Sequence, residues 1–387
     1  MIPSFNNFLN TKPLYYKDID HKRVHQAYAR LKPHIKQVKT VHIVGTNAKG
    51  STGRILADLA AKSGLSVGHF SSPHIMKFNE RLYLNGSDIS ASDLEAAHKK
   101  LFSILGQEMS EFLSYFEYST LLAFVAFEHC NLLVLEAGLG GEFDATNVCD
   151  KVLSIITPIG IDHQNFLGDS IMEISATKIR SIQKQALLAP QVYDEVLSVA
   201  KEIAKEKNAQ LFVSSKISTD RMLNLKKIAK EKNWGAYLID NAHVALQALD
   251  ILGIKYDINA LLEIVLFGRF YTLTKNVRID VGHNTLAATA IEKALDEKVV
   301  LIYNSLGDKD YKKIFKILKP KIKRVEILPI QAQGAANTEE IKKALKKVGL
   351  KYKYFDNIID KNEKYLVFGS FYVVEAFLKK VKINVPK

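Results

Sequence analysis

The chain has 387 residues, of which 47% are hydrophobic and 25% are charged. One ordinary hydrophobic core does not accommodate this length, so we expect two domains of unequal size. No apolar run reaches the roughly 18–20 residues of a membrane-spanning helix, and residues 1–7 lack the charged-then-apolar order of a secretory signal. Cys130 and Cys149 are too few for a disulfide framework, so we expect a cytoplasmic protein that binds no membrane.

The formal net charge of +13 raises the question of a nucleic-acid partner. Only nine of the 54 basic residues are arginines, and the lysines gather in runs such as 226–232 and 342–347, which is typical of solvated helix faces. A protein that binds duplex phosphates would favour clustered arginines and aromatics. A positive field also attracts small polyanions, so charge alone does not identify the partner.

Short apolar runs alternate with helical patterns along the whole chain, which predicts an α/β fold with mostly parallel strands. The first series of predicted strands covers 41–44, 66–70, 132–135, 152–156, 186–189 and 210–213. Residues 241–252 predict an apolar helix, and residues 267–270 a break. The second series of strands covers 277–281, 299–303, 324–328 and 365–368. We therefore expect a first domain over 1–266 and a second over 267–387.

Residues 40–52 have the layout of a phosphate-binding loop. A β-branched apolar run stops at Gly45, small residues follow, and Lys49 and Ser51 open a predicted helix. Backbone N–H groups at such a helix start face phosphate oxygens, the lysine neutralises charge between them, and a hydroxyl reaches Mg²⁺. This segment predicts a nucleoside triphosphate as ligand.

The match to the usual phosphate-loop pattern is not literal. Ala48 precedes Lys49, where the pattern has a glycine, and Gly50 is inserted before Ser51. The alternative is a glycine-rich turn that joins a buried strand to a helix, as any doubly wound fold requires. The loop alone therefore leaves nucleotide binding open, and a second signal is needed.

Polar functional groups follow other predicted strands directly. In an open parallel sheet, the carboxyl ends of the strands form the ligand crevice. The segments concerned are 71–74 with 78–81, 135–147, 157–163 and 279–284. Each has another explanation: Glu136 could cap a helix, His163 could be a satisfied loop histidine, and residues 280–284 could form a turn. Beside a phosphate loop, however, a carboxylate, an imidazole and a serine hydroxyl together predict a Mg²⁺–ATP site.

These motifs resemble the Mur ligase superfamily and, within it, folylpolyglutamate synthase/dihydrofolate synthase. The family's loop reads Gly-Thr-Asn-Gly-Lys-Gly-Ser, and its later motifs are Ser-Pro-His with Glu-Arg, Glu-x-Gly-Leu-Gly-Gly-x-x-Asp-Ala-Thr-Asn, Ile-x-x-Asp-His and a helical lysine. Its C-terminal motifs are Gly-Arg, Asp-x-x-His-Asn and Asp-Lys-Asp. The matching positions, in the same order, are 45–51, 72–74, 80–81, 136–147, 159–163, Lys178, 268–269, 280–284 and 308–310. The resemblance implies a Mur ligase-like fold, with a P-loop parallel-sheet ATPase domain followed by a smaller Rossmann-like α/β domain that binds glutamate.

The resemblance also implies a role for individual residues. It assigns ATP contacts to Ala48, Lys49, Gly50, Ser51, Asn241, Arg269 and Asp280. It assigns two Mg²⁺ ions to Ser72, Glu136, His163 and Lys178, of which Lys178 is carbamylated by CO₂. A carbamate is an anionic oxygen ligand, whereas an ammonium would be repelled by the cation. The expected catalytic residues are Lys49, His163, Lys178 and His283.

The acceptor site implied by the resemblance consists of Phe116, Glu117, Asp144 and Ala145, which match the segments that receive the pteroate. An aromatic ring can stack on the pterin, and an acidic group can accept from its N–H donors. The chain departs from the family at several positions beside the Ala48 substitution. Glu142 stands where a basic residue is frequent, Thr177 and Arg180 flank Lys178 in place of Glu and Gly, and Tyr237-Leu238 replaces His-Gln ahead of Asn241.

The resemblance therefore implies an ATP-dependent amide ligase of folate biosynthesis and one-carbon metabolism. ATP would phosphorylate a carboxylate of dihydropteroate or a folate, and the amino group of L-glutamate would attack the acyl phosphate. Domain closure would bring Arg269, Asp280 and His283 onto the nucleotide and exclude water. We expect a monomer that binds no nucleic acid. The alternatives are a cell-wall ligase acting on a UDP-sugar peptide and a basic nucleotide switch that binds nucleic acid. Which folate acceptor is used stays open.

Overall fold

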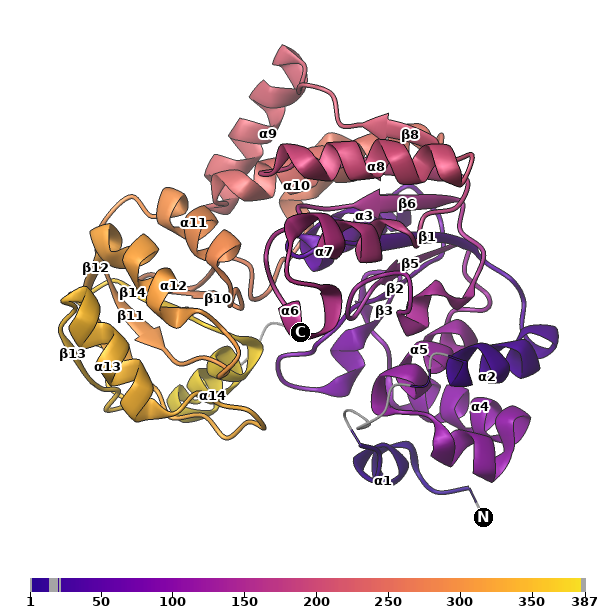
Figure 1. Ribbon diagram of the computed structural model, residues 1–387, viewed down its shortest axis with the longest axis horizontal. Helices are drawn as coiled ribbons and strands as arrows, with labels where there is room; N and C mark the ends of the chain where they lie inside the picture. Colours follow the sequence, from indigo (N-terminus) through magenta and orange to yellow (C-terminus); the bar gives the residue numbers. More distant parts are fainter. Residues whose placement is uncertain (1, 14–19, 21, 384–387) are drawn as a thin grey trace. The chain divides into compact units, whose positions relative to one another are not determined.

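The computed structural model describes residues 2–13, 20 and 22–383. The chain divides into two compact units, the first made of residues 1–216 with 244–260 and the second of 217–243 with 261–387. Helix α10 (Ala236–Ile251) therefore contributes residues to both units. Figure 1 shows the elements of each unit, coloured along the sequence.

An eight-stranded sheet, counted over the described residues, forms the centre of the first unit. Its order is β4-β3-β2-β5-β1-β6-β7-β8. The strands from β2 to β8 in this order run parallel to one another, whereas β3 pairs antiparallel with both β2 and β4. The strands are β1 (Lys39–Val44), β2 (Val67–Phe70), β3 (Leu82–Leu84), β4 (Ser87–Asp88), β5 (Leu132–Glu136), β6 (Leu153–Ile156), β7 (Gln185–Leu188) and β8 (Gln210–Val213). Because β5, β1 and β6 are parallel neighbours, the loops that follow them meet at one edge of the sheet.

Helices cover this sheet (Figure 1). They are α1 (Phe5–Asn10), α2 (Arg23–Leu31), α3 (Lys49–Lys62), α4 (Ala91–Phe112), α5 (Tyr115–Ala126), α6 (Gln164–Leu167), α7 (Ile171–Ile179) and α8 (Asp194–Glu206). Side chains of α1, α2, α4 and α5 pack with Phe70 and Leu135 of the sheet in one buried cluster. Side chains of α7 and α8 pack with Ile156 and Leu188 in another. Burying these apolar faces is the main favourable term that fixes the sheet edge in place.

A six-stranded sheet, again over the described residues, forms the second unit. Its order is β13-β12-β11-β14-β10-β9, and only β9 at the edge is antiparallel. The strands are β9 (Tyr271–Thr274), β10 (Val277–Asp280), β11 (Val299–Tyr303), β12 (Ile322–Ile327), β13 (Tyr352–Tyr354) and β14 (Tyr365–Phe368). The helices are α9 (Thr219–Lys232), α11 (Thr285–Ala294), α12 (Tyr311–Leu318), α13 (Thr338–Val348) and α14 (Phe371–Val381). The apolar faces of α11, α12 and α13 pack with Leu301, Tyr303 and Phe368 in one core cluster.

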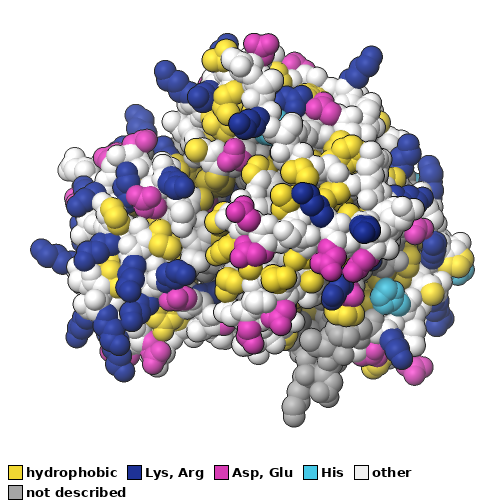
Figure 2. Space-filling model, turned by 45° about the horizontal axis from the view of Figure 1, so that its top comes forward, with side chains coloured by type: hydrophobic (Ala, Val, Ile, Leu, Met, Phe, Trp, Pro, Cys, Tyr) yellow, Lys and Arg dark blue, Asp and Glu magenta, His cyan; other side chains and the backbone are white. Residues whose placement is uncertain are grey.

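The predicted α/β class is confirmed, and every strand predicted from the sequence is present with ends shifted by at most a few residues. The strands that the sequence did not predict, β3, β4, β9 and β13, are short strands at or beside a sheet edge. No helix within the described ranges is both long and apolar enough to cross a bilayer. On the face shown in Figure 2, basic side chains lie among acidic and hydrophobic ones instead of forming one continuous patch.

Candidate active site

The glycine that ends the first strand is required by a close approach of two loops. Gly45 follows β1 with φ of +148°, a conformation that other residues rarely adopt. A Cβ at this position would lie 2.0 Å from Oγ1 of Thr157, the residue that follows β6. Thr157 in turn donates both its N–H (2.8 Å) and its hydroxyl (3.0 Å) to the carbonyl of Val44. The ends of β1 and β6 are therefore locked together.

The loop between β1 and α3 is held along one side by the segment after β6. The N–H groups of Thr46 and Asn47 donate to the carbonyl of Pro158 at 3.0 and 3.1 Å. The Thr46 hydroxyl donates to Gly160 O (3.1 Å) and accepts from Gly160 N–H (3.0 Å). These bonds fix the loop before the helix starts at Lys49, so the backbone at the start of α3 is held in one position.

Ala48 stands where the usual loop pattern has a glycine, and it adopts the left-handed backbone conformation that favours glycine. Its φ is +68° and its ψ is −7°, and it precedes the first residue of α3. The Ala48 carbonyl accepts from Thr52 N–H at 2.9 Å and from the Ser51 hydroxyl at 3.1 Å. A non-glycine residue in this region costs about 1–2 kcal/mol, so the loop shape is retained at some expense in stability.

Two lysines converge on the same backbone oxygen in this loop. Lys49 Nζ donates to Gly45 O and Thr46 O, both at 3.2 Å, and Lys178 Nζ from α7 donates to Gly45 O at 3.2 Å. Lys178 is buried. Burial, and after it the charge of Lys49, lower the pKa of Lys178 to about 7, against an opposing effect of Asp162 and Asp144. A large share of Lys178 is therefore an uncharged amine near neutral pH.

A carboxylate and a serine lie together where β2 and β5 end. Glu136, the last residue of β5, is buried, and its Oε2 accepts from the N–H of Ser72 at 3.4 Å. The next residue, Ala137, donates its N–H to Ile43 O of β1 at 2.9 Å, so the end of β5 is fixed to the strand that precedes residues 45–48. Among the described residues, no three His, Cys, Asp or Glu side chains gather as a metal cluster.

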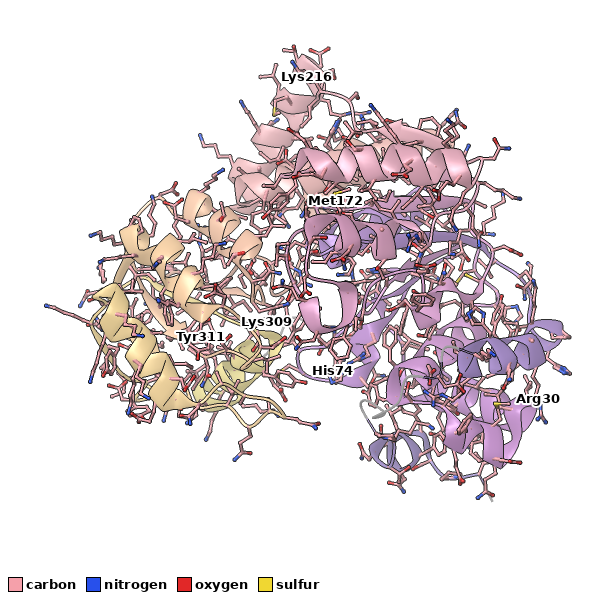
Figure 3. All side chains as sticks on the ribbon, in the orientation of Figure 1. Arg30, His74, Met172, Lys216, Lys309 and Tyr311 are labelled. Carbon is pink, nitrogen blue, oxygen red and sulfur yellow. The ribbon has the colours of Figure 1, made fainter. Side chains whose placement is uncertain are left out.

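The remaining residues of this edge come from the loops after β2 and β6. His163 has φ of +52°, and its N–H donates to Oδ1 of Asp162 at 2.9 Å. His74, labelled in Figure 3, accepts at Nδ1 from Nε of Arg81 at 2.8 Å. Burial and the Arg81 charge lower the pKa of His74 to about 4, so this imidazole is neutral and its other nitrogen carries the proton.

The expected acceptor residues surround the loop after β5. A Cβ at Gly138 would lie 2.5 Å from Cζ of Phe116, and the Phe116 ring centroid is 5.9 Å from that of Phe70. Asp144 is buried, and its carboxylate accepts from Leu139 N–H (2.7 Å) and Thr146 N–H (3.0 Å). Burial raises the pKa of Asp144. The Asp144 carboxylate thus holds the shape of this loop.

Glu117 is fixed by a partner that lies far away in the sequence. Its Oε2 accepts from Arg23 Nε (2.9 Å), from Arg23 Nη2 (2.8 Å) and from Ser114 N–H (2.7 Å), and Glu117 N–H donates to Ser114 Oγ. This capping box starts α5. Both partners of the ion pair are buried, so the orientation of the Glu117 carboxylate is set before any ligand binds.

In the second unit, Asp280 closes β10 and organises the turns on both sides. Its Oδ1 accepts from Gly282 N–H (2.7 Å), and its Oδ2 accepts from Phe270 N–H (2.8 Å) and the Tyr237 hydroxyl (2.9 Å). Arg269 lies over the ring of Phe371 at 5.2 Å. Burial raises the pKa of Asp280, and Arg269 opposes this effect.

The other expected residues of this unit lie on neighbouring elements. His283 Nδ1 lies 3.2 Å from Val281 O, and Asn284 caps α11 by accepting from Ala287 N–H at 2.9 Å. Asn241 is buried in α10.

Curated relatives and solved structures that are similar to this chain come from the same family. No family model matches the chain. A dihydrofolate synthase/folylpolyglutamate synthase of Buchnera aphidicola subsp. Schizaphis graminum is 32% identical over 367 residues, covering 86% of each chain. The chain belongs to the dihydrofolate synthase/folylpolyglutamate synthase family.

Solved structures of this family agree with the assignment. Helicobacter pylori folylpolyglutamate synthetase is 40% identical, with 98% of each chain covered and a TM-score of 0.79. Escherichia coli FolC in complex with DHPP and ADP is 27% identical, with 97% of this chain and 96% of that chain covered and a TM-score of 0.82. The predicted Mur ligase-like fold is confirmed. The chain is an ATP-dependent ligase that adds L-glutamate to a pteroate or folate acceptor, and the folate branch is favoured over the cell-wall alternative.

Two of the departures from the family pattern meet in the structure. Glu142 N–H donates to Thr177 O at 2.8 Å, and a Cβ at Gly141 would lie 2.4 Å from Lys178 O. This packing of the loop on α7 brings Arg180 Nη1 within 3.5 Å of Glu142 Oε2. The acidic residue that replaces a basic one is therefore paired with an arginine that replaces a glycine.

Sequence analysis missed two residues of the site. Neither Arg23 nor Tyr237 was assigned to the site, yet each contacts a carboxylate that was. The departure at Tyr237 was visible in the sequence, but its partner was not. Arg23 left no signal beyond being one of only nine arginines in a lysine-rich chain.

Proposed function

We propose that the enzyme uses 7,8-dihydropteroate as its preferred acceptor and extends folates as a second activity, through an acyl phosphate. The γ-phosphoryl group of ATP is transferred to a carboxylate oxygen of the acceptor, and ADP leaves. The amino nitrogen of L-glutamate then attacks the carbonyl carbon, the amide bond forms and phosphate leaves with the carboxylate oxygen. Water must be excluded because it would hydrolyse the acyl phosphate.

The observation that carries the phosphate site is the convergence of Lys49 and Lys178 on the Gly45 carbonyl, in the loop between β1 and α3. Lys49 balances charge on the transferring phosphoryl group. The backbone of Ala48, Gly50 and Ser51 supplies N–H groups to the phosphates.

The donors at the sheet edge fit magnesium. Mg²⁺ is held by one or two carboxylates together with phosphate oxygens and water rather than by an all-protein cage, which agrees with the buried Glu136 beside Ser72. Ser72 and Glu136 would hold one ion, and His163 with Lys178 a second. The ions would offset the negative charge that develops on the phosphoryl oxygens.

The role of Lys178 follows from its charge state. An uncharged amine can add CO₂, forming an N–C bond and releasing a proton, and the product is an anionic oxygen ligand. The pKa of about 7 makes this addition feasible near neutral pH. An ammonium next to Lys49 would instead oppose cation binding.

Four residues of the second unit are also assigned to ATP. Arg269 binds phosphate, Asp280 binds the ribose and Asn241 binds the adenine, while His283 acts near the transferred phosphoryl group. The stacking of Arg269 on Phe371 and the three donors on Asp280 support these roles, because both side chains are held in place before ATP arrives.

Acceptor binding is assigned to Phe116, Glu117 and the loop containing Asp144 and Ala145. The DHPP complex of the Escherichia coli relative supports a pteroate-type acceptor. Phe116 is the residue expected to stack on the pterin, and the Glu117 carboxylate accepts from its N–H donors. Glu142 pairs with Arg180, so this position offers no net positive charge to long anionic glutamate tails, which favours dihydropteroate.

The same proposal includes the role of each domain, the oligomeric state and the cellular location of the enzyme. The predicted domain over 1–266 would bind ATP and folate, and the predicted domain over 267–387 would bind glutamate; the compact units differ from these bounds in that residues 217–243 and 261–266 pack with the second unit. The enzyme would act as a monomer in the cytoplasm, in folate biosynthesis.

An acceptor panel tests the proposed function. Glutamate-dependent phosphate release is measured with dihydropteroate, tetrahydrofolate and triglutamylated tetrahydrofolate, for the wild type and for Lys49→Ala. We expect the highest kcat/KM with dihydropteroate and a loss of about a hundredfold or more in Lys49→Ala. Turnover only with the triglutamylated acceptor would contradict the acceptor assignment, and an active Lys49→Ala would contradict the phosphate site.

A further inference from the structure

Asp280 is held by three donors that come from three separate segments of the second unit. They are the N–H groups of Gly282 and Phe270 and the hydroxyl of Tyr237. Two of these donors, Phe270 N–H and Tyr237 Oη, share Oδ2, at 2.8 and 2.9 Å. Gly282 N–H alone donates to Oδ1, at 2.7 Å, in the described part of the chain. Within that part, Oδ2 therefore accepts two hydrogen bonds, whereas Oδ1 accepts one.

Tyr237 lies in the first turn of α10 and packs against the core of the second unit. A Cβ on Gly235 would lie 3.1 Å from Cε1 of Tyr237 and 2.9 Å from Cβ of Ala294. The absence of a side chain at Gly235 thus leaves room for the ring. Burial, and after it the Asp280 charge, raise the pKa of Tyr237 well above its usual value, so the hydroxyl keeps its proton and donates.

We propose that Tyr237 is a positioning residue for the nucleotide: with Phe270 N–H it fills Oδ2 of Asp280 and directs Oδ1 toward the ribose hydroxyls of ATP. This inference rests on the proposed role of Asp280 in ribose binding. A carboxylate oxygen accepts two hydrogen bonds. Oδ2 has both, whereas Oδ1 has one, so a ribose hydroxyl adds to Oδ1 without displacing a donor.

The Asp280 carboxylate also contacts the turn that precedes β9, through Phe270 N–H. Phe270 has φ of +47°, and Val281 N–H donates to Gly268 O at 3.0 Å. The Asp280 bond to Phe270 N–H therefore helps to hold the turn that contains Arg269. Removal of the Tyr237 hydroxyl leaves this bond in place, since Phe270 and Gly282 still donate. The expected result is a carboxylate that rotates more freely in an intact fold.

The test compares ATP with 2′,3′-dideoxy-ATP in the full-length enzyme. For each variant, kcat/KM is measured with both nucleotides, and their ratio gives the discrimination due to the ribose hydroxyls. The variants are Tyr237→Phe, Asp280→Asn and the control Tyr271→Phe, which removes a hydroxyl from the adjacent strand β9. The ratio is independent of the fraction of folded enzyme, so a purely structural defect does not change it.

We expect the wild type and Tyr271→Phe to prefer ATP by about tenfold to a hundredfold, the range of a hydrogen bond to a charged group. Tyr237→Phe should lose most of this preference and approach Asp280→Asn, mainly through a higher KM for ATP. Loss of preference in Asp280→Asn but not in Tyr237→Phe would overturn the role of Tyr237 alone. An unchanged preference in Asp280→Asn would overturn ribose binding by Asp280, and with it the inference.

Discussion

The side-chain nitrogens of Lys49 and Lys178 both donate to the carbonyl oxygen of Gly45, each at 3.2 Å. Lys178 is buried, which disfavours its charged form, and the nearby positive charge of Lys49 disfavours it further. The pKa of Lys178, lowered to about 7, is the consequence. The arrangement suits a residue that is converted from a cation into an anionic ligand.

Activity should therefore depend on pH and CO₂ together. Above pH 7 more of Lys178 is the uncharged amine, so carbamate formation and activity should rise as pH increases through about 7. Depletion of CO₂ should lower activity, and more strongly at pH 6 than at pH 8. The measurement is ¹³C NMR of enzyme equilibrated with ¹³CO₂, beside an activity assay.

The control for this prediction is Lys151→Arg. Lys151 is also buried with a pKa lowered to about 8, but it has no proposed role in catalysis. The carbamate resonance should disappear in Lys178→Ala and persist in Lys151→Arg. A resonance that persists in Lys178→Ala, or full activity without CO₂, would contradict the carbamate.

Ala48→Gly should stabilise the protein. Ala48 is held at φ of +68°, and relief of this conformation is worth about 1 kcal/mol after the greater chain entropy of glycine is considered. Thermal unfolding of the apoenzyme measures the effect. Ala57→Gly, within the same helix α3, should instead destabilise by about 1 kcal/mol. A lower midpoint for Ala48→Gly than for the wild type would show that the loop is not strained.

Glu136→Gln should raise the requirement for magnesium. The variant keeps the side-chain shape but removes the charge of the buried carboxylate beside Ser72, so apparent Mg²⁺ affinity should fall about tenfold or more. Titration of activity with Mg²⁺ gives the apparent affinity of each variant. Asp58→Asn is the control, since Asp58 is a buried carboxylate farther along α3 that pairs with Tyr83 of β3. Equal Mg²⁺ dependence in Glu136→Gln and the wild type would place the metal elsewhere.

Glu117→Gln should weaken acceptor binding selectively. The carboxylate is oriented by Arg23 and Ser114, and loss of its charge should raise KM for dihydropteroate about tenfold, while KM for ATP changes by less than about twofold. Steady-state kinetics with each substrate varied in turn measures both. Glu128→Gln, which breaks a partly buried ion pair with Lys100 close to the same helix, should alter neither KM. Equal changes in both KM values would indicate a structural defect.

The sequence predicted the parts of this molecule that depend on local patterns. Buried parallel strands such as β1 and β5 are near-continuous apolar runs, and the residues after them carry the functional groups. Short edge strands such as β4 have too few residues to show a period. Their pairing is imposed by the neighbouring strand.

Long-range pairs could not be predicted in the same way. Arg23 and Glu117 are 94 residues apart, and Tyr237 and Asp280 are 43 residues apart. No periodicity or motif links such positions, because their contact depends on the packing of whole helices against the sheet. The carboxylates were found through their motifs, while the residues that orient them became visible only in the fold.

The acyl phosphate is tested most directly by following the carboxylate oxygen. Dihydropteroate labelled with ¹⁸O in its carboxylate is incubated with enzyme, ATP and L-glutamate, and the released phosphate is analysed by mass spectrometry. Transfer of the γ-phosphoryl group to this carboxylate predicts one ¹⁸O atom in each phosphate derived from fully labelled acceptor. Phosphate released without ¹⁸O, at the same rate as dihydrofolate forms, would contradict the proposed mechanism.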